Sequence, residues 1–401
     1  MRHAIGLARK GEGSTSPNPL VGAVLVSHDQ VIAEGHHGRF GGPHAEPRLL
    51  AGLSNRVVPR DAELFLTLEP CSYHGKTPPC VEALLACGIR RFVVATTDPN
   101  PKVRGRGVAT LRRAGCHIRL GVLADDAKAL NVPYFLSQRE GRARVTLKLA
   151  STADGMLADR TGASRWITGP RARREVDRLR ARCDAVVVGS GTVDRDDPRL
   201  RSKTTPRRSP TRIVLAGRLG CDPDCRLARL WRKDVGSLFR PSGLQVGNWV
   251  RPEGSRSTGW IRRPRLIVAT VDPPARRRAA FERAGWEIWD LPGDAGRIDL
   301  PALSRRACRE GLIDLVVEPG PTLAAGFLET GPVDRILLFL APKVLGGDHG
   351  WTRALAPRLL RSALQAVPGT PPRVLGSDLL LELTGPRGGP ILPGRRMAPV
   401  R

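Results

Sequence analysis

Three side chains that bind soft divalent cations lie within the first 80 positions: His44, Cys71 and Cys80. One neutral imidazole and two thiolates suit Zn²⁺, and three protein ligands leave a fourth position for water. Water on that cation ionises near neutral pH and becomes a nucleophile. Glu46 stands two residues after His44 at the expected start of a helix, where it can exchange protons with the water without binding the metal.

The order and spacing of these residues favour a metal site over three unrelated side chains. Cys71 follows an expected strand, and Cys80 lies in the first turn of an expected helix, where a thiolate is stabilised. His-x-Glu followed by Pro-Cys and a second Cys is the arrangement of zinc nucleobase deaminases. Deaminases of nucleic acids and nucleosides usually place two residues between the cysteines, whereas eight residues, 72–79, intervene here.

Longer motifs connect this pattern to one family. They are Pro17–Gly22, Gly42–Glu46, Thr67–Cys71, Thr77–Cys80, Asp98–Pro101 and Gly105–Gly107. Over most of residues 1–137 the chain resembles the bifunctional deaminase/reductases of riboflavin biosynthesis. The resemblance implies a cytidine-deaminase-like fold that removes the C2 amino group from a phosphorylated diaminopyrimidinone. It places the zinc ligands on His44, Cys71 and Cys80 and the proton shuttle on Glu46. Lys76 and His74, in the loop between the cysteines, are predicted to hold the substrate's phosphate.

The second half carries motifs that resemble the reductase half of the same family. They are Lys148–Gly155, Ser164–Thr168, Gly191–Val193, Asp196–Pro198, Gly320–Leu323, Ala341–Lys343 and Leu345–Gly347. The resemblance implies a dihydrofolate-reductase-like fold that uses NADPH to reduce the opened ribose of the deaminated product to ribityl. No Gly-x-Gly-x-x-Gly follows an expected strand, so a Rossmann site is not indicated.

The resemblance also assigns residues to the two sides of the reductase site. The nucleotide side comprises Ala150, Trp166, Thr192, Asp196, Gly217, Gly320, Pro321, Thr322, Leu323, Ala324, Ala325 and Gly326. The substrate side comprises Ser164, Arg180, Leu200, Lys203 and Glu318. Three positions depart from the family's usual residues: Lys203 replaces an arginine, Ala216 an acidic residue and Pro319 a small residue. These departures leave open a protein with an active deaminase and a non-functional reductase half.

Alternating strand and helix signals predict an α/β chain of two domains. The deaminase domain is expected over residues 1–140, with one helix over 125–137, and the reductase domain over 144–385. Residues 221–264 are rich in Arg, Gly, Pro and Ser and are expected to form an irregular insertion. Residues 386–401 are expected to be a flexible tail. The deaminase domain is predicted to have three layers.

Composition limits the remaining function classes. The formal net charge is +27, but 57 of the 65 basic residues are Arg, spread along the whole chain, and aromatic residues make up 4%. A groove for single-stranded nucleic acid needs aromatic platforms beside its cations, so a small-molecule substrate is favoured over RNA. A basic RNA-acting zinc deaminase and a non-catalytic zinc module remain as alternatives. We expect a cytoplasmic protein without a membrane partner, and homo-oligomerisation is left open.

Overall fold

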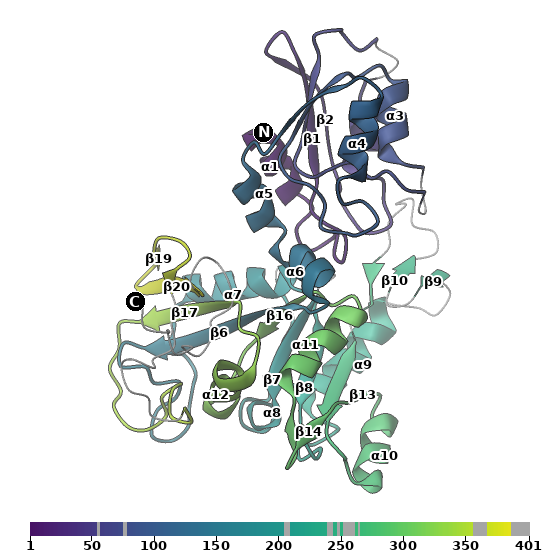
Figure 1. The fold of residues 1–401 in the computed structure, drawn as a ribbon. Helices are drawn as coiled ribbons and strands as arrows, with labels where there is room; N and C mark the ends of the chain where they lie inside the picture. Colours follow the sequence, from purple (N-terminus) through teal and green to yellow (C-terminus); the bar gives the residue numbers. More distant parts are fainter. Residues whose placement is uncertain are drawn as a thin grey trace, which may run out of the picture. The chain divides into compact units, whose positions relative to one another are not determined.

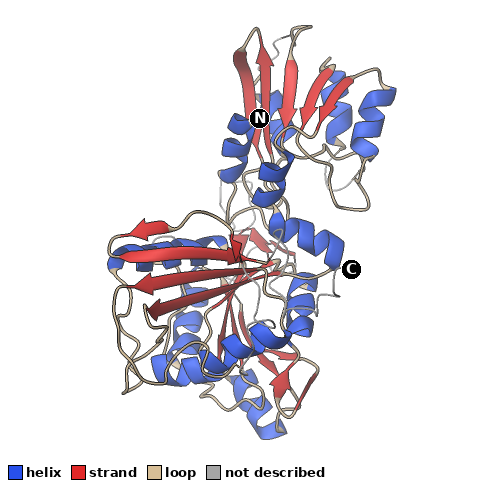
Figure 2. Ribbon diagram, turned by 60° about the vertical axis from the view of Figure 1, so that its left-hand side comes forward, coloured by secondary structure: helices blue, strands red, loops and turns tan. Residues whose placement is uncertain are grey.

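The computed structural model describes residues 1–53, 57–74, 78–203, 209–238, 244–246, 249–251, 261–263, 265–355 and 367–385. It divides into two compact units: residues 1–141 with 242–261, and residues 142–241 with 262–401. The predicted tail 386–401 and the predicted phosphate contact Lys76 lie outside the described residues. Each unit has its own sheet (Figures 1 and 2).

The first unit is built on a five-stranded sheet in the order β2-β1-β3-β4-β5. β1 pairs antiparallel with β2 and β3, whereas β3, β4 and β5 are parallel. The strands are β1 (Gly22–Ser27), β2 (Gln30–His36), β3 (Glu63–Leu66), β4 (Arg91–Val94) and β5 (His117–Leu120). The helices are α1 (Arg2–Arg9), α2 (Ala45–Ala51), α3 (Cys80–Ala86), α4 (Arg106–Arg113), α5 (Ala124–Leu130) and α6 (Val132–Glu140).

Side chains of the first sheet alternate between two helical layers. Leu25, Leu64 and Leu66 pack with buried residues of α2 and α3 on one face. Val24, between two inward positions of β1, packs with α1 on the other face. Period-two alternation of this kind buries both faces of a central sheet. The unit is therefore a three-layer α/β fold, and it places the starts of α2 and α3 on the same side of the sheet.

The second unit contains a larger sheet in the order β13-β12-β8-β7-β16-β6-β17-β20-β18, with β19 paired to β20. The strands from β13 to β17 in this order run parallel, and β20 is antiparallel to β17. Those strands are β6 (Arg144–Thr152), β7 (Ala185–Gly189), β8 (Thr211–Leu215), β12 (Leu266–Thr270), β13 (Glu287–Asp290), β16 (Asp314–Val317), β17 (Arg335–Ala341), β18 (Val367–Pro368), β19 (Arg373–Leu375) and β20 (Asp378–Thr384).

Helices cover both faces of the parallel strands. They are α7 (Pro170–Arg182), α8 (Ser190–Asp196), α9 (Arg226–Leu238), α10 (Ala275–Arg283), α11 (Leu300–Arg309) and α12 (Pro321–Thr330). The shorter strands form two small sheets. One contains β11 (Ile261–Arg262), β10 (Trp249–Arg251) and β9 (Leu244–Val246), of which β9 and β10 belong to the first unit. The other pairs β14 (Gly293–Asp294) with β15 (Arg297–Ile298). Figure 1 shows α11 and α12 on one face of the sheet and α7 on the other.

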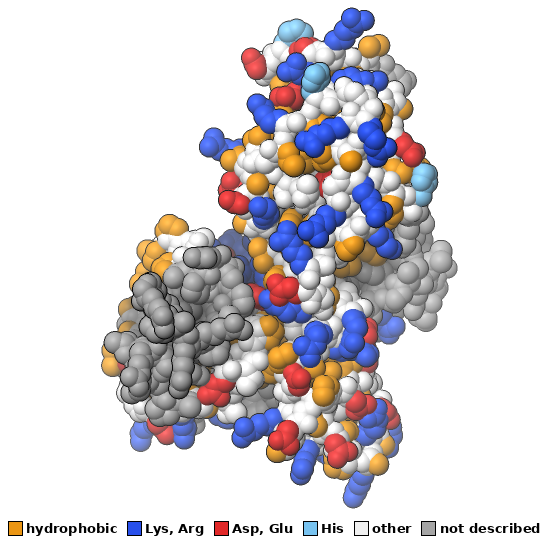
Figure 3. Space-filling view, viewed as in Figure 1, with side chains coloured by type: hydrophobic (Ala, Val, Ile, Leu, Met, Phe, Trp, Pro, Cys, Tyr) orange, Lys and Arg blue, Asp and Glu red, His pale blue; other side chains and the backbone are white. Residues whose placement is uncertain are grey.

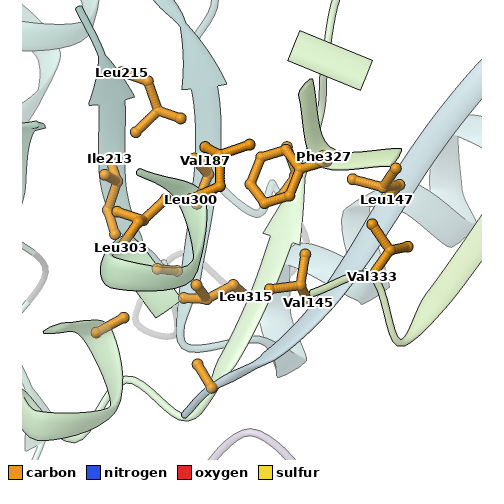
Figure 4. Packing of buried hydrophobic residues seen from close by; sticks show 14 of the residues in the cluster. Val145, Leu147, Val187, Ile213, Leu215, Leu300, Leu303, Leu315, Phe327 and Val333 are labelled. Carbon is orange, nitrogen blue, oxygen red and sulfur yellow. The ribbon is translucent and has the colours of Figure 1, made fainter. Parts of the chain in front are cut away.

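The core of the second unit follows the strand period. In β7 the side chain of Val187 faces α11 and α12, and Val186 faces the opposite layer. Figure 4 shows the ring of Phe327 from α12 among aliphatic side chains of the strands. Because helices bury both faces, these strands are continuous apolar runs rather than alternating ones. Their carboxyl ends all open at one edge of the sheet.

Two predicted elements are corrected by the structure. The single helix expected over residues 125–137 is two helices, α5 and α6, because Pro133 has no N–H to donate and blocks the preceding turn. Asn131 at the break bonds both the N–H and the carbonyl of Leu20, at 2.8 and 2.9 Å. The insertion expected to be irregular over 221–264 begins with the regular helix α9, whose Leu227 and Ala228 are fully buried.

Basic side chains are scattered over the visible surface of both units and do not gather into one stripe (Figure 3). Among the described residues, no helix is both long and apolar enough to cross a membrane.

Candidate active sites

The three predicted metal ligands come from the ends of three elements in residues 1–141. His44 directly precedes α2, Cys71 lies in the loop after β3, and Cys80 is the first residue of α3. His44 Nδ1 is 3.3 Å from Cys80 Sγ and 3.8 Å from Cys71 Sγ. All three donor atoms lie within 4.8 Å of one another. The fold thus brings together residues that are up to 36 positions apart in the sequence.

The donor set fits a tetrahedral zinc ion. Zn–S and Zn–N bonds of ordinary length place neighbouring donors about 3.3–3.8 Å apart, and both nitrogen–sulfur distances fall in that range. The N–H of Cys80 donates to Cys71 Sγ at 3.3 Å. Hydrogen bonds from the Cys80 thiol and the His44 ring lower the pKa of the Cys71 thiol. Cys71 is therefore stabilised as the thiolate that a cation requires.

Glu46 lies in the first turn of α2, where the carboxylate is 3% exposed. Burial raises the pKa of this carboxyl, while the neighbouring His44 opposes the shift. The carboxyl is also within hydrogen-bonding reach of Cys80, so it reaches the ligand cluster from its own helix. The predicted acid–base residue thus lies beside the predicted ligands, as a proton transfer next to a metal requires.

Sequence reasoning gave no role to Glu69, which fixes the loops around this cluster. Its carboxylate accepts hydrogen bonds from the backbone N–H groups of Asp98, Gly105 and Val108, at 2.9–3.1 Å. A Cβ at Gly107 would lie 2.2 Å from the carbonyl oxygen of Pro70, so this close approach requires glycine. Glu69 therefore joins the segment before Cys71 to the start of α4. Its position within the Thr67–Cys71 motif was the one sequence signal of a role at this site.

A second buried carboxyl, Asp98, lies beside this network and is 6% exposed. It accepts hydrogen bonds from the N–H of Asn100 at 2.8 Å and from the hydroxyl of Tyr134 at 2.9 Å. Burial raises the pKa of Asp98 from 3.8 to about 6, although both hydrogen bonds oppose the shift. The folded state therefore binds a proton here more tightly than the unfolded chain does.

Asp98→Asn is expected to reduce the loss of folding stability that accompanies a rise in pH. The stability contributed by the raised pKa is complete below about pH 4 and is lost as the pH rises through about 6, because the folded state must then ionise a buried carboxyl. The amide keeps an acceptor for Asn100 and Tyr134 and does not ionise. We compare the free energy of unfolding of the variant with that of wild type at each pH. Between pH 4 and pH 8 this difference should shift in favour of the variant by on the order of 3 kcal/mol.

Urea denaturation at both pH values, with zinc added, measures this change. Asp126→Asn, an exposed carboxyl on α5, controls for the loss of one negative charge. Equal pH dependence in wild type and Asp98→Asn would contradict the assignment.

Of the two predicted phosphate contacts in the loop between the cysteines, only His74 is among the described residues. His74 is exposed and has no described bond to the ligand cluster. Their assignment stays a prediction.

In the second unit, the predicted reductase residues gather at the carboxyl edge of the parallel strands. Glu318 follows β16, Ala150 lies near the end of β6, and Gly217 follows β8. Thr192 and Asp196 lie on α8, directly after β7. Ligands of open α/β sheets bind at this edge, where successive loops meet. The topology therefore places predicted residues from the ends of four strands, β6, β7, β8 and β16, along one side of the sheet.

Arg180 and Glu318 form a largely buried charge pair. The guanidinium of Arg180 on α7 donates two parallel hydrogen bonds to the carboxylate, at 2.7 and 2.8 Å. Burial opposes ionisation, but the charges of Arg180 and Lys148 lower the pKa of Glu318 to about 2. Burial lowers the pKa of Lys148, which lies over the ring of Phe339. Sequence reasoning assigned no role to Lys148, although a lysine within an apolar strand was a signal.

The two predicted sides of the site meet at Asp196. Its carboxylate accepts a hydrogen bond from the Ser164 hydroxyl at 3.3 Å, and its backbone carbonyl accepts from Arg165. Thr192 Oγ1 lies 4.0 Å from the position that a Cβ on Gly320 would take. Gly320 precedes α12, and no side chain caps the first-turn N–H groups of this helix. Those N–H groups remain available to an anion such as a nucleotide phosphate.

Other predicted residues are less closely connected. The Lys203 side chain is exposed, and its backbone N–H donates to Asp177 at 2.6 Å. Leu200 is 2% exposed and has a positive φ of 45°. The Gly217 carbonyl accepts hydrogen bonds from the N–H of Val271 and the hydroxyl of Thr270. Ala216 and Pro319, which differ from the family's usual residues, are both buried, and Pro319 directly follows Glu318.

Comparison with known families assigns both halves of the chain. Residues 1–96 match the cytidine and deoxycytidylate deaminase zinc-binding region. Residues 143–361 match the RibD C-terminal domain. The second match covers more than half of the chain and includes the Arg180–Glu318 pair.

Whole proteins give the same result. The riboflavin biosynthesis protein RibD of Actinobacillus pleuropneumoniae is 34% identical over 352 residues, covering 88% of this chain and 85% of the relative. RibD of Escherichia coli strain K12 is 34% identical over 355 residues, covering 87% of this chain and 88% of the relative.

Two solved structures share the fold across nearly their full length. Acinetobacter baumannii RibD superposes with a TM-score of 0.78 and 30% identity, covering 96% of this chain and 97% of the other. The diaminohydroxyphosphoribosylaminopyrimidine deaminase/5-amino-6-(5-phosphoribosylamino)uracil reductase of Thermotoga maritima gives 0.74 and 30% at the same coverage. The predicted combination of a cytidine-deaminase-like and a reductase fold is thereby confirmed, and the chain belongs to the RibD family of riboflavin biosynthesis proteins.

Proposed function

We propose that the protein catalyses two consecutive steps of riboflavin biosynthesis. The first is hydrolytic deamination of 2,5-diamino-6-(5-phosphoribosylamino)pyrimidin-4-one. The second is NADPH-dependent reduction of the ribosyl group to ribityl, which gives 5-amino-6-(5-phosphoribitylamino)uracil. The observation that carries the proposal is the convergence of His44, Cys71 and Cys80 beside the buried Glu46. Matches to both a deaminase and a reductase family support an enzyme that acts on a small molecule, and RNA-acting and deaminase-only alternatives are not favoured.

In the deamination, His44, Cys71 and Cys80 would hold the zinc ion, which activates a water molecule as the nucleophile. Glu46 would accept a proton from the attacking water and deliver it to the amino nitrogen that leaves C2. One C–O bond forms, one C–N bond breaks, and ammonia leaves. Glu69 keeps the segment before Cys71 in place during this exchange.

In the reduction, NADPH supplies the hydride. Hydride transfer needs no nucleophile from the protein, so the residues act by alignment and charge. The first-turn N–H groups of α12, which no side chain caps, would donate to the nucleotide's phosphates, with Thr192 beside them. Arg180 and Lys148, whose charges act on Glu318, would supply positive charge to the phosphorylated substrate, and Glu318 would accept hydrogen bonds from its hydroxyl groups. Lys203 and Leu200 stay predicted substrate contacts, and a cytoplasmic location stays a prediction.

A coupled assay tests both steps and their order. Purified protein is given the diaminopyrimidinone phosphate and NADPH, and ammonia release and NADPH loss are followed together. We expect one NADPH oxidised per ammonia, with ammonia released first. If the amino substrate supported NADPH oxidation as fast as the deaminated product does, without ammonia release, the order of deamination before reduction would be contradicted. Ammonia release without NADPH loss would leave only the deaminase, and salt-dependent retention on RNA would favour the nucleic-acid alternative.

A further inference from the structure

The segment Trp166–Gly169 lies between two parts of the reductase edge. It precedes α7, which carries Arg180, and follows Ser164, which bonds to Asp196. The Trp166 side chain is 61% exposed, which is unusual for the largest apolar side chain in a folded protein. An exposed aromatic ring at the edge where ligands bind has a face available to a flat ligand.

Three side chains from other elements hold this segment. Lys343 Nζ donates to the carbonyl oxygen of Trp166 at 2.9 Å. Arg173 lies over the Trp166 ring, 4.5 Å from its centre, and donates to the carbonyl of Thr168 at 2.6 Å. The Asp378 carboxylate accepts the N–H of Gly169 at 2.6 Å.

The holding residues share a place in the sheet. Lys343 follows the carboxyl end of β17, and Asp378 is the first residue of β20. Because these strands are antiparallel neighbours, with Leu340 opposite Leu379, the two side chains emerge at the same end of the ladder. Asp378 is 1% exposed. A rigid strand pair therefore supports a loop that is more than 170 residues away in sequence.

Trp166 is 61% exposed, and the face of its ring that Arg173 does not cover is called the free face below. Arg173 occupies one face by a cation–π contact. A cavity of about 300 Å³ lies among Trp166, Arg173, Lys343 and Asp378. Neither Arg173 nor Lys343 forms an ion pair with a carboxylate among the described residues, so both cations are committed to backbone carbonyls and to the ring. Lys343 and Arg173 therefore hold the backbone of residues 166–168 in place and do not neutralise a carboxylate.

We propose that Lys343 and Arg173 are positioning residues of the reductase reaction, which hold Trp166 so that its free face meets the nicotinamide nucleotide. This inference rests on the proposed function. Neither residue needs to touch the ligand, since each acts through Trp166. Misplacing an aligned group by about 1 Å can cost 10²-fold in rate, so loss of one restraint should have a measurable effect.

The test uses the full-length holoenzyme with NADPH and the deaminated substrate. Lys343→Met and Arg173→Met are each expected to lower kcat/KM for NADPH about 10-fold, while ammonia release by the same preparation is unchanged. Lys343→Arg should restore most of the loss, because it also donates to the Trp166 carbonyl. Arg174→Met, an exposed neighbour on α7, is the matched control and should behave as wild type.

A double-mutant cycle distinguishes positioning from a general structural role. If Lys343 acts through the indole, Lys343→Met should add little to the loss already caused by Trp166→Ala. Losses that multiply, or single variants with wild-type kcat/KM, would overturn the proposal while leaving the proposed reduction intact. Absence of NADPH oxidation by wild-type protein that still binds zinc and releases ammonia would instead overturn the proposed reductase function and the positioning role with it.

Discussion

Glu46→Gln is expected to lower the rate of ammonia release by roughly 10²- to 10⁴-fold, which is the usual contribution of a general acid–base group. The amide has nearly the same size and keeps a hydrogen-bonding oxygen, but it does not accept the proton of the attacking water. His44, Cys71 and Cys80 are unchanged, so the protein should still bind one zinc ion. Steady-state ammonia release and metal content measured on the same sample check both statements.

The structure offers a matched control for this variant. Glu82 stands two residues after Cys80 in the first turn of α3, as Glu46 stands two residues after His44 in α2. Glu82 is exposed, whereas Glu46 is 3% exposed, so Glu82→Gln should leave ammonia release unchanged. NADPH oxidation with the deaminated substrate should be normal in both variants. Rapid ammonia release by zinc-loaded Glu46→Gln would refute the proton-shuttle role.

That His44, Cys71 and Cys80 lie together could be expected from the sequence, because each of them lies in a short motif at the end of an element. His44 and Cys80 are set by the starts of α2 and α3, so local helix geometry determines where each side chain begins. The parallel strands of the second unit were also predictable as apolar runs. Their carboxyl ends then placed Glu318 and Thr192 on one edge.

Features that depend on distant contacts could not be predicted in the same way. Glu69 acts through backbone N–H groups about 30–40 residues away, and no side-chain pattern marks such partners. The helix α9 was missed because its apolar positions are embedded among arginines. Trp166 was assigned to the nucleotide side by resemblance, but the residues that hold it, Lys343 and Asp378, become neighbours only through the pairing of β17 with β20.

Glu318→Gln is expected to produce the largest defect in the reductase unit, because it removes a charge from a buried cluster. Arg180 and Glu318 are 22% and 14% exposed, so the variant leaves a largely buried guanidinium without its counter-charge. Breaking such a pair costs about 3 kcal/mol. Loss of a charged acceptor for the substrate should also lower kcat/KM for reduction by roughly 10- to 100-fold. Thermal unfolding and NADPH oxidation measure the two effects separately.

A second pair on the same strand separates stability from function. Asp314, the first residue of β16, accepts two hydrogen bonds from Arg144 at 2.9 and 2.7 Å, and these side chains are 15% and 16% exposed. This pair matches the Arg180–Glu318 pair in chemistry and burial, but it lies at the amino end of the strand and Glu318 follows the carboxyl end. Asp314→Asn should therefore destabilise the protein by a similar amount and leave kcat/KM for reduction unchanged at a temperature where both variants are folded.

The comparison of these two variants decides what the carboxyl edge contributes. If Glu318→Gln lowers stability and kcat/KM while Asp314→Asn lowers stability alone, the loss of activity comes from the position of Glu318 among Arg180 and Lys148 and not from weakened folding. If both variants lose activity in proportion to stability, Glu318 is a structural residue and the substrate must be recognised elsewhere on the edge. Because Arg180 keeps its charge in Glu318→Gln, a KM for the phosphorylated substrate that stays constant while kcat falls would place Glu318 at the reacting ribosyl group.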